Sequence, residues 1–158
     1  MGYSEKIVKH GLPGKFDYLD HTADVYIVAY GSNLIELFEN AGLALFDTMT
    51  DISKVQEKEE RSIEVNGIDL ENLLYRWIEE LLTLYYSENL MCSKIIVESI
   101  EIKRSGEDIE YTLKGKCYGE QFDPERHEPK VEVKAMTYHL MRILKDEEKW
   151  RAYFVLDI

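Results

Sequence analysis

The chain of 158 residues is poor in cysteine and proline: it contains two cysteines and three prolines. Cys92 and Cys117 are far apart in sequence and form no CxxC pair, so we expect reduced, partly buried thiols rather than a zinc site. No run of eighteen apolar residues is present, and the first twelve residues lack the apolar core of a signal peptide. These absences predict a single cytoplasmic domain without a membrane span.

The sequence also lacks the common catalytic motifs. No nucleophile elbow, phosphate-binding loop, dinucleotide fingerprint or Ser-His-Asp order is present, so nothing indicates a nucleophile or a nucleotide cradle. Basic residues are outnumbered by acidic ones: the chain has 19 Lys and Arg and 31 Asp and Glu, which gives a net charge of -12. Such a balance repels a phosphate backbone and favours a cation or a basic protein as the partner.

Hydrophobic periodicity predicts the secondary structure. Apolar residues recur at helical spacing in residues 34–49, where Ser32 is the expected N-cap, and again from about Asp69. Alternating patterns predict strands at residues 24–31, 61–66, 94–103, 109–118, 130–135, 138–144 and 150–156. We therefore expect an α+β fold with two helices packed on one mostly antiparallel sheet, in a single domain of residues 16–158. Gly11, Pro13 and Gly14 make residues 1–15 an expected flexible lead-in.

Two acidic positions lie at the ends of strand-like segments. Asp157 and the main-chain carboxylate of Ile158 follow an apolar run, and two adjacent negative charges need a cation or a donor-rich pocket. Near the other end, Asp24 opens a strand three residues after His21, where it can offer an oxygen ligand. Taken by itself, an Asp at a strand end is more often a turn residue.

A polar loop and the segment after it supply further candidates. Residues 119–129 form a long loop that contains Asp123 and His127, and such loops often carry function. Lys134 and His139 follow in a segment expected to join two strands. Each candidate also has a purely structural explanation. The loop could simply be solvated, Lys134 could be a charge on the solvent face of a strand, and His139 could be hydrogen-bonded to a neighbour.

Several segments together resemble the archease family, in the same order and with approximately the same spacing. Each is modest alone, but the set covers nearly all of residues 16–158. The matching segments are FDYLDHTADV at 16–25, LFENA at 37–41, GEQFD at 119–123 with Arg126-His127, VKAMTYH at 133–139, and the end of the chain from Trp150 to Ile158.

The resemblance implies an accessory protein that is not itself an enzyme. Archease-like proteins promote guanylylation and repeated turnover of an RtcB-type RNA ligase, which acts in tRNA splicing and RNA repair. The family binds a divalent cation, typically Ca²⁺, through positions that here are Asp24, Asp157 and Ile158; Mg²⁺ or Mn²⁺ would also suit oxygen ligands. Residues expected to support these ligands or to contact the partner are His21, Asp123, His127, Lys134 and His139. Contact with tRNA is expected only through the ligase, and no contact with a membrane is expected.

Two other functions remain open on the residues alone. A metal-dependent hydrolase could use His21, Asp24 and Asp157 to hold a metal-bound water, although it needs more ligands than the sequence offers. A tRNA-binding chaperone is the other alternative, and it needs a basic surface that the net charge does not suggest.

Overall fold

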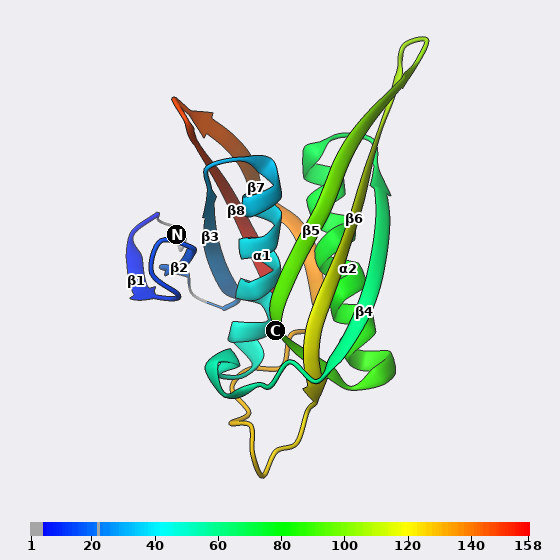
Figure 1. Cartoon of the computed structure of the whole chain (residues 1–158). Helices are drawn as coiled ribbons and strands as arrows, with labels where there is room; N and C mark the ends of the chain where they lie inside the picture. The colour runs from blue at the N-terminus through cyan, green and yellow to red at the C-terminus, as the bar shows by residue number, and fades with distance from the viewer. Residues whose placement is uncertain (1–4, 22) are drawn as a thin grey trace.

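The structure, a computed structural model, describes residues 5–21 and 23–158 (Figure 1). Within these ranges the two expected helices and the late strands are present. The elements are β1 (Ile7–His10), β2 (Phe16–Leu19), β3 (Val25–Gly31), α1 (Leu34–Met49), the short 3-10 helix η1 (Ile52–Lys54), β4 (Glu59–Gly67), α2 (Leu70–Glu88), β5 (Leu90–Ser105), β6 (Asp108–Gln121), β7 (Ala135–Asp146) and β8 (Lys149–Asp157).

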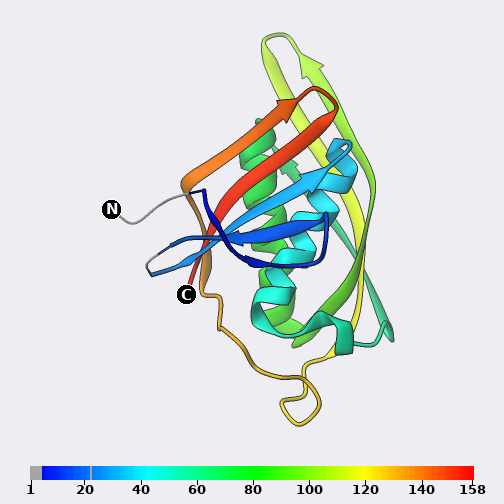
Figure 2. The ribbon, with the colours of Figure 1, turned by 90° about the vertical axis from the view of Figure 1, so that its left-hand side faces the viewer.

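The strands form two antiparallel sheets, and the helices lie between them (Figures 1 and 2). One sheet has the order β1-β2-β3-β8-β7 and the other has the order β4-β6-β5. The α+β class with two helices is thus confirmed, but the expectation of one sheet was wrong. The physical reason is visible in α1, where Ala41 to Phe46 are all buried. A helix that is apolar all round must be covered on both sides, which one sheet cannot do.

Local signals fix the helix ends. The N-cap of α1 is Asn33 rather than the expected Ser32, because Asn33 Oδ1 accepts the backbone N–H of Glu36 at 2.8 Å. Glu36 Oε1 in turn accepts the N–H of Ser32 at 3.0 Å, so two otherwise unpaired donors are satisfied. Asp69 caps α2 in the same way by accepting the N–H of Asn72 at 2.7 Å.

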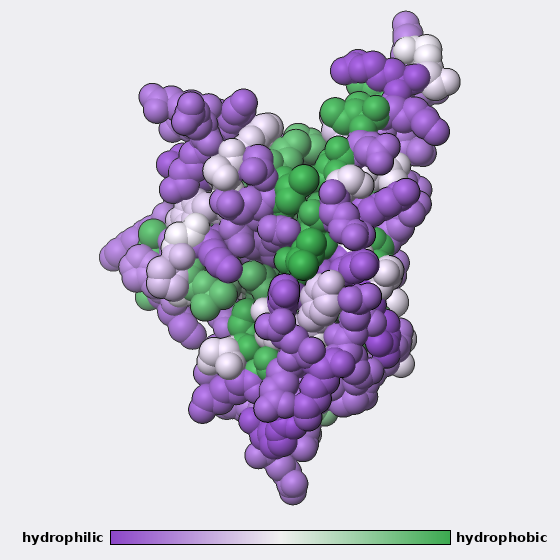
Figure 3. Space-filling model, viewed as in Figure 1, coloured by the Kyte–Doolittle hydropathy of each residue, from purple (hydrophilic) through white to green (hydrophobic). Residues whose placement is uncertain are grey.

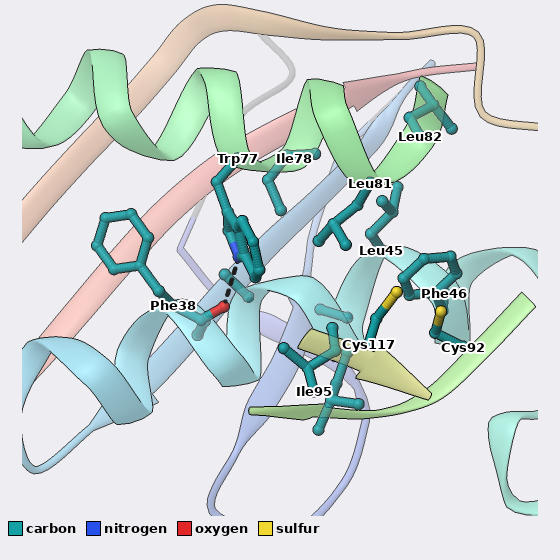
Figure 4. Packing of buried hydrophobic residues seen from close by; sticks show 14 of the residues in the cluster. Phe38, Leu45, Phe46, Trp77, Ile78, Leu81, Leu82, Cys92, Ile95 and Cys117 are labelled. Carbon is teal, nitrogen blue, oxygen red and sulfur yellow. Dashed lines mark hydrogen bonds between the residues drawn. The ribbon is translucent and has the colours of Figure 1, made fainter. Parts of the chain in front are cut away.

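Trp77 on α2 ties the two helices together at the centre of the core (Figure 4). Its side chain is fully buried, and its indole N–H donates to the carbonyl oxygen of Phe38 on α1 at 2.9 Å. Gly42 lets both β5 and α2 approach α1, since a Cβ there would lie 2.5 Å from the Ile95 side chain and 3.0 Å from the Leu81 side chain. Both cysteines are buried and free, as expected.

Two segments differ from the sequence-based expectation. The lead-in contains β1, which pairs with β2 although all four of its residues are exposed. Residues 130–134 form no strand, because this stretch is bonded to the end of α1: the Lys130 N–H donates to Met49 O at 3.0 Å, and Thr50 Oγ1 donates to Glu128 O at 2.7 Å. Consequently β7 begins only at Ala135 and extends through the expected break, although its register with β8 shifts between Thr137 and Arg142.

Within the described ranges, no helix combines the length and the apolar character needed to cross a membrane.

Candidate functional site

The pairing of β3 with β8 brings the two predicted aspartates to neighbouring strand ends. The ladder between these strands ends at the pair Val25–Leu156, so Asp24 and Asp157 are the next residues on two adjacent antiparallel strands. Asp24 lies in a bend one residue outside this ladder, so the register places it near Asp157 without pairing the two residues. Positions 133 residues apart in sequence are therefore neighbours because of the sheet register alone.

The start of β7 joins the same place. Asp157 pairs with Ala135, and its carbonyl oxygen accepts the backbone N–H of Lys134 at 2.7 Å. Ile158 is half-buried and packs against the main core, which holds the end of the chain in position. Figure 2 shows the C-terminus close to the segment that leads into β7. The strand pairing thus places Asp24 near Asp157 and Ile158, and of Lys134 it brings only the backbone N–H to this end of the sheet.

His21 supports Asp24 through the backbone. Its Nδ1 accepts the N–H of Asp24 at 3.0 Å, and its ring makes an edge contact with Tyr26, with 5.9 Å between centroids. A neutral imidazole whose Nδ1 accepts a hydrogen bond carries its proton on Nε2. His21 therefore positions the turn before β3. Because its Nδ1 already accepts this hydrogen bond, that nitrogen is not available as a base or as a metal ligand. This counts against a metal-dependent hydrolase that uses His21.

Asp24 lines a pocket of about 650 Å³ that the sequence alone did not indicate. One wall is Tyr18, whose hydroxyl donates to Asp47 Oδ2 at 3.0 Å; burial, and then the negative charge of Asp47, raise the pKa of this tyrosine. The opposite wall comes from the loop after β6. The ionisable groups of the lining are four carboxylates, two lysines, two tyrosines and one histidine. They are Asp20, Asp24, Asp47, Glu128, Lys9, Lys130, Tyr18, Tyr26 and His21.

The donor chemistry of the strand ends suits a hard cation. Among residues 5–21 and 23–158, no group donates a hydrogen bond to the side chain of Asp24 or Asp157, so their oxygens can serve as ligands. In the same ranges, no three His, Cys, Asp or Glu side chains gather in a metal-binding group. A cation held by Asp24, Asp157 and the Ile158 carboxylate would therefore complete its coordination with water or a partner.

Asp123 and His127 belong to a different cluster, built around Glu120. His127 is 1% exposed; its Nδ1 accepts the N–H of Asp123 at 2.9 Å, and its Nε2 lies 3.0 Å from Glu120 Oε2. Burial opposes ionisation of Glu120, but hydrogen bonds from Arg126, the Gln56 N–H and His127 outweigh it and lower its pKa to about 2. This cluster fixes the loop after β6, which forms one wall of the pocket.

The remaining two candidates, Lys134 and His139, are exposed, and neither side chain belongs to the Glu120 cluster or to the pocket beside Asp24. The Lys134 side chain lines a separate hollow of about 460 Å³ between α2 and the start of β7. His139 lies in the irregular part of β7, where its N–H donates to Thr137 Oγ1 at 3.1 Å. Neither is placed as a ligand of the aspartates, so we propose both only as surface residues that a partner could contact.

Comparison with known proteins identifies the group to which this chain is related. The model of the archease protein family matches residues 16–158. The chain belongs to the archease family. A relative from Sulfurisphaera tokodaii, named protein archease, is 51% identical over 91% of this chain and 99% of its own length. The protein archease of Pyrococcus abyssi is 46% identical over 91% of this chain and 99% of its own length.

Solved structures agree with this membership. The solution structure of protein 1598 from Methanobacterium thermoautotrophicum superposes with a TM-score of 0.74, at 38% identity, over 92% of this chain and 99% of that one. The crystal structure of an archease from Thermotoga maritima, described as a possible chaperone, gives a TM-score of 0.52 at 22% identity over 87% and 93% of the two chains. The latter likeness concerns the fold alone.

Proposed function

We propose that this chain activates an RtcB-type RNA ligase by promoting its guanylylation and its multiple turnover, and that it does not join RNA itself. The observation that carries the proposal is membership of the archease family over residues 16–158, which covers every element except β1. The activator binds tRNA only through the ligase, and it works in the cytoplasm.

A divalent cation bound by Asp24, Asp157 and the main-chain carboxylate of Ile158 is part of the proposal. Neighbouring carboxylates repel each other, and a cation between them relieves that repulsion. Oxygen ligands favour Ca²⁺, while Mg²⁺ and Mn²⁺ fit the same donor chemistry. Such a cation would hold the ends of β3 and β8 and the start of β7 together, and would leave coordination positions open toward the ligase.

The charge of the molecule fits the proposed partner. A net charge of -12 over 158 residues favours encounter with a ligase whose surface must be basic to hold RNA and GTP. The cation then has a second use, because it lowers the local negative charge at the place where an RNA-bound ligase would otherwise be repelled.

The test is transfer of labelled GMP to a cognate ligase, with and without this chain. We expect the wild-type chain to accelerate guanylylation, and Asp24→Ala and Asp157→Ala to lose most of that effect. Asp108→Ala is the matched control, because Asp108 lies at the far tip of the β5–β6 hairpin and its loss changes the net charge equally. A cognate ligase that is loaded equally fast without the chain contradicts the proposal. Joining of RNA by the chain in the absence of ligase contradicts it in the other direction.

A further inference from the structure

Strand β1 lies outside the family match, yet it forms part of the candidate site. The family model begins at Phe16, whereas β1 spans Ile7–His10. Val8 and Lys9 of this strand nevertheless line the same pocket as Asp24 and Asp47. This chain therefore has a pocket wall that the family pattern does not supply.

The contacts that hold β1 are weak ones. Ile7 and Val8 are 39% and 58% exposed, so the strand buries little apolar surface. Beyond the ladder with β2, this segment is held by a hydrogen bond between His10 Nδ1 and Asp17 Oδ1 at 2.9 Å, by the Asp20 N–H donating to Lys6 O at 2.9 Å, and by an ion pair between Glu5 and Arg142. The imidazole of His10 is exposed, whereas the carboxylate of Asp17 is buried. The Glu5–Arg142 pair is exposed on both sides, and such a pair typically contributes at most about 1 kcal/mol. An edge strand with so few contacts can separate from β2 without unfolding the core.

Lys9 carries positive charge into the pocket. Its Nζ lies 5.5 Å from the centre of the Tyr18 ring, and the Tyr18 hydroxyl bonds to Asp47. The ammonium group is thus held beside the acidic lining by the aromatic ring. A cation that binds at Asp24 meets the repulsion of Lys9 as long as β1 stays in place.

We propose that β1 is a detachable strap that lowers the affinity of the Asp24 site for a divalent cation, and that Lys9 is the residue through which it acts. With the strap closed, Lys9 competes electrostatically for the pocket; with the strap released, the cation binds more tightly. Because coupling between two equilibria is reciprocal, cation binding must also favour release of the strap. This inference rests on the cation site of the proposed function, and it adds a regulation that belongs to this chain.

Titration calorimetry of the full chain with CaCl₂ tests the strap. Lys9→Ala should bind Ca²⁺ at least about threefold more tightly than wild type, because removing a unit positive charge lowers the repulsion that the divalent ion meets. Lys6→Ala makes the same change in net charge within the same segment, but Lys6 does not line the pocket, so its affinity should equal that of wild type. The gain from Lys9→Ala should shrink as NaCl is added, because exposed charges are screened.

Amide hydrogen exchange gives a second readout on the unmodified chain. Saturation with Ca²⁺ should accelerate exchange in residues 7–10 about threefold, while exchange in the core of α2 stays constant. If wild type binds Ca²⁺, Asp24→Ala does not, and Lys9→Ala binds as wild type does, the cation site stands and the strap is overturned. Exchange in residues 7–10 that is unchanged or slower with Ca²⁺ also overturns it. Absence of Ca²⁺ binding in every variant overturns both the cation site and the strap.

Discussion

At the scale of single residues, Glu120 shows how a buried charge can organise a loop. Its carboxylate accepts hydrogen bonds from Arg126 at 2.6 Å and from the Gln56 N–H at 2.7 Å, and lies 3.0 Å from His127 Nε2. These donors come from the segment before β4 and from the loop after β6. One side chain therefore joins the two segments at this end of the molecule, and a buried charge with this many partners is costly to disturb.

The pKa of Glu120 predicts how stability changes with pH. Because the folded-state pKa is lowered from 4.5 to about 2, its contribution is present above pH 4.5 and is lost as the pH falls toward 2. Glu120→Gln should lower the free energy of unfolding at pH 7 by about 2 kcal/mol, and the gap to wild type should narrow between pH 4.5 and pH 2. Urea unfolding at several pH values measures the loss at pH 7 and the narrowing of the gap, with Glu125→Gln as the control from the same loop. A gap that stays constant down to pH 2 contradicts this role.

At the scale of elements, the extents of the two helices followed from local pattern, whereas the N-cap of α1 and the sheet arrangement did not. Helical spacing and the N-cap at Asp69 are encoded within a few residues, which is why both helices were predicted closely. The division into two sheets depends on strand pairs far apart in sequence. Strand β1 gave no alternating apolar signal because it is exposed on both faces, and the stretch before Ala135 alternates yet is drawn into a loop by its bonds to α1.

The same contrast applies to the candidate site. Asp24 and Asp157 could be proposed from sequence because one precedes and the other ends a strand-like run, and the register then placed these two strand ends side by side. The sequence could not indicate three other residues, because their roles depend on neighbours that only the fold supplies: Tyr18, Asp47 and Glu120. Figure 3 shows the related difficulty at the surface: hydrophilic residues cover most of this face, so hydrophilic character alone marks no particular site.

The helix layer depends on one polar contact in an apolar core, between Trp77 and Phe38. Trp77→Phe removes the indole N–H that the Phe38 carbonyl accepts and leaves a small void, so we expect a loss of about 1–3 kcal/mol in the free energy of unfolding. Tyr75→Phe on the same helix is the control, because it removes a hydroxyl from a half-buried ring that stacks on Tyr138. Equal stability of Trp77→Phe and wild type, measured by urea unfolding, would show that the two helices do not need this contact.

At the scale of the whole molecule, the candidate site lies away from the long β5–β6 hairpin, whose tip projects from the body (Figure 1). An extension after Ile158 converts its carboxylate into an amide and places additional chain at the site. We expect such an extension to weaken Ca²⁺ binding at least tenfold, because it removes one of three proposed ligands, while circular dichroism stays as in wild type.

The structure also decides the control for this experiment. An N-terminal tag is unsuitable, because β1 lies against the same pocket. The same residues inserted after Gly106, at the exposed tip of the β5–β6 hairpin, add equal mass far from the site. Unchanged Ca²⁺ affinity in the C-terminally extended chain would remove the Ile158 carboxylate from the ligand set.

Multiple-turnover RNA joining tests the central claim most directly. A cognate ligase is supplied in limiting amount with excess RNA ends, GTP and divalent cation, and joined product is counted per ligase molecule. We expect many products per ligase with the wild-type chain or with Asp108→Ala, and about one per ligase without the chain or with Asp24→Ala. Equal product per ligase with and without the wild-type chain would contradict it.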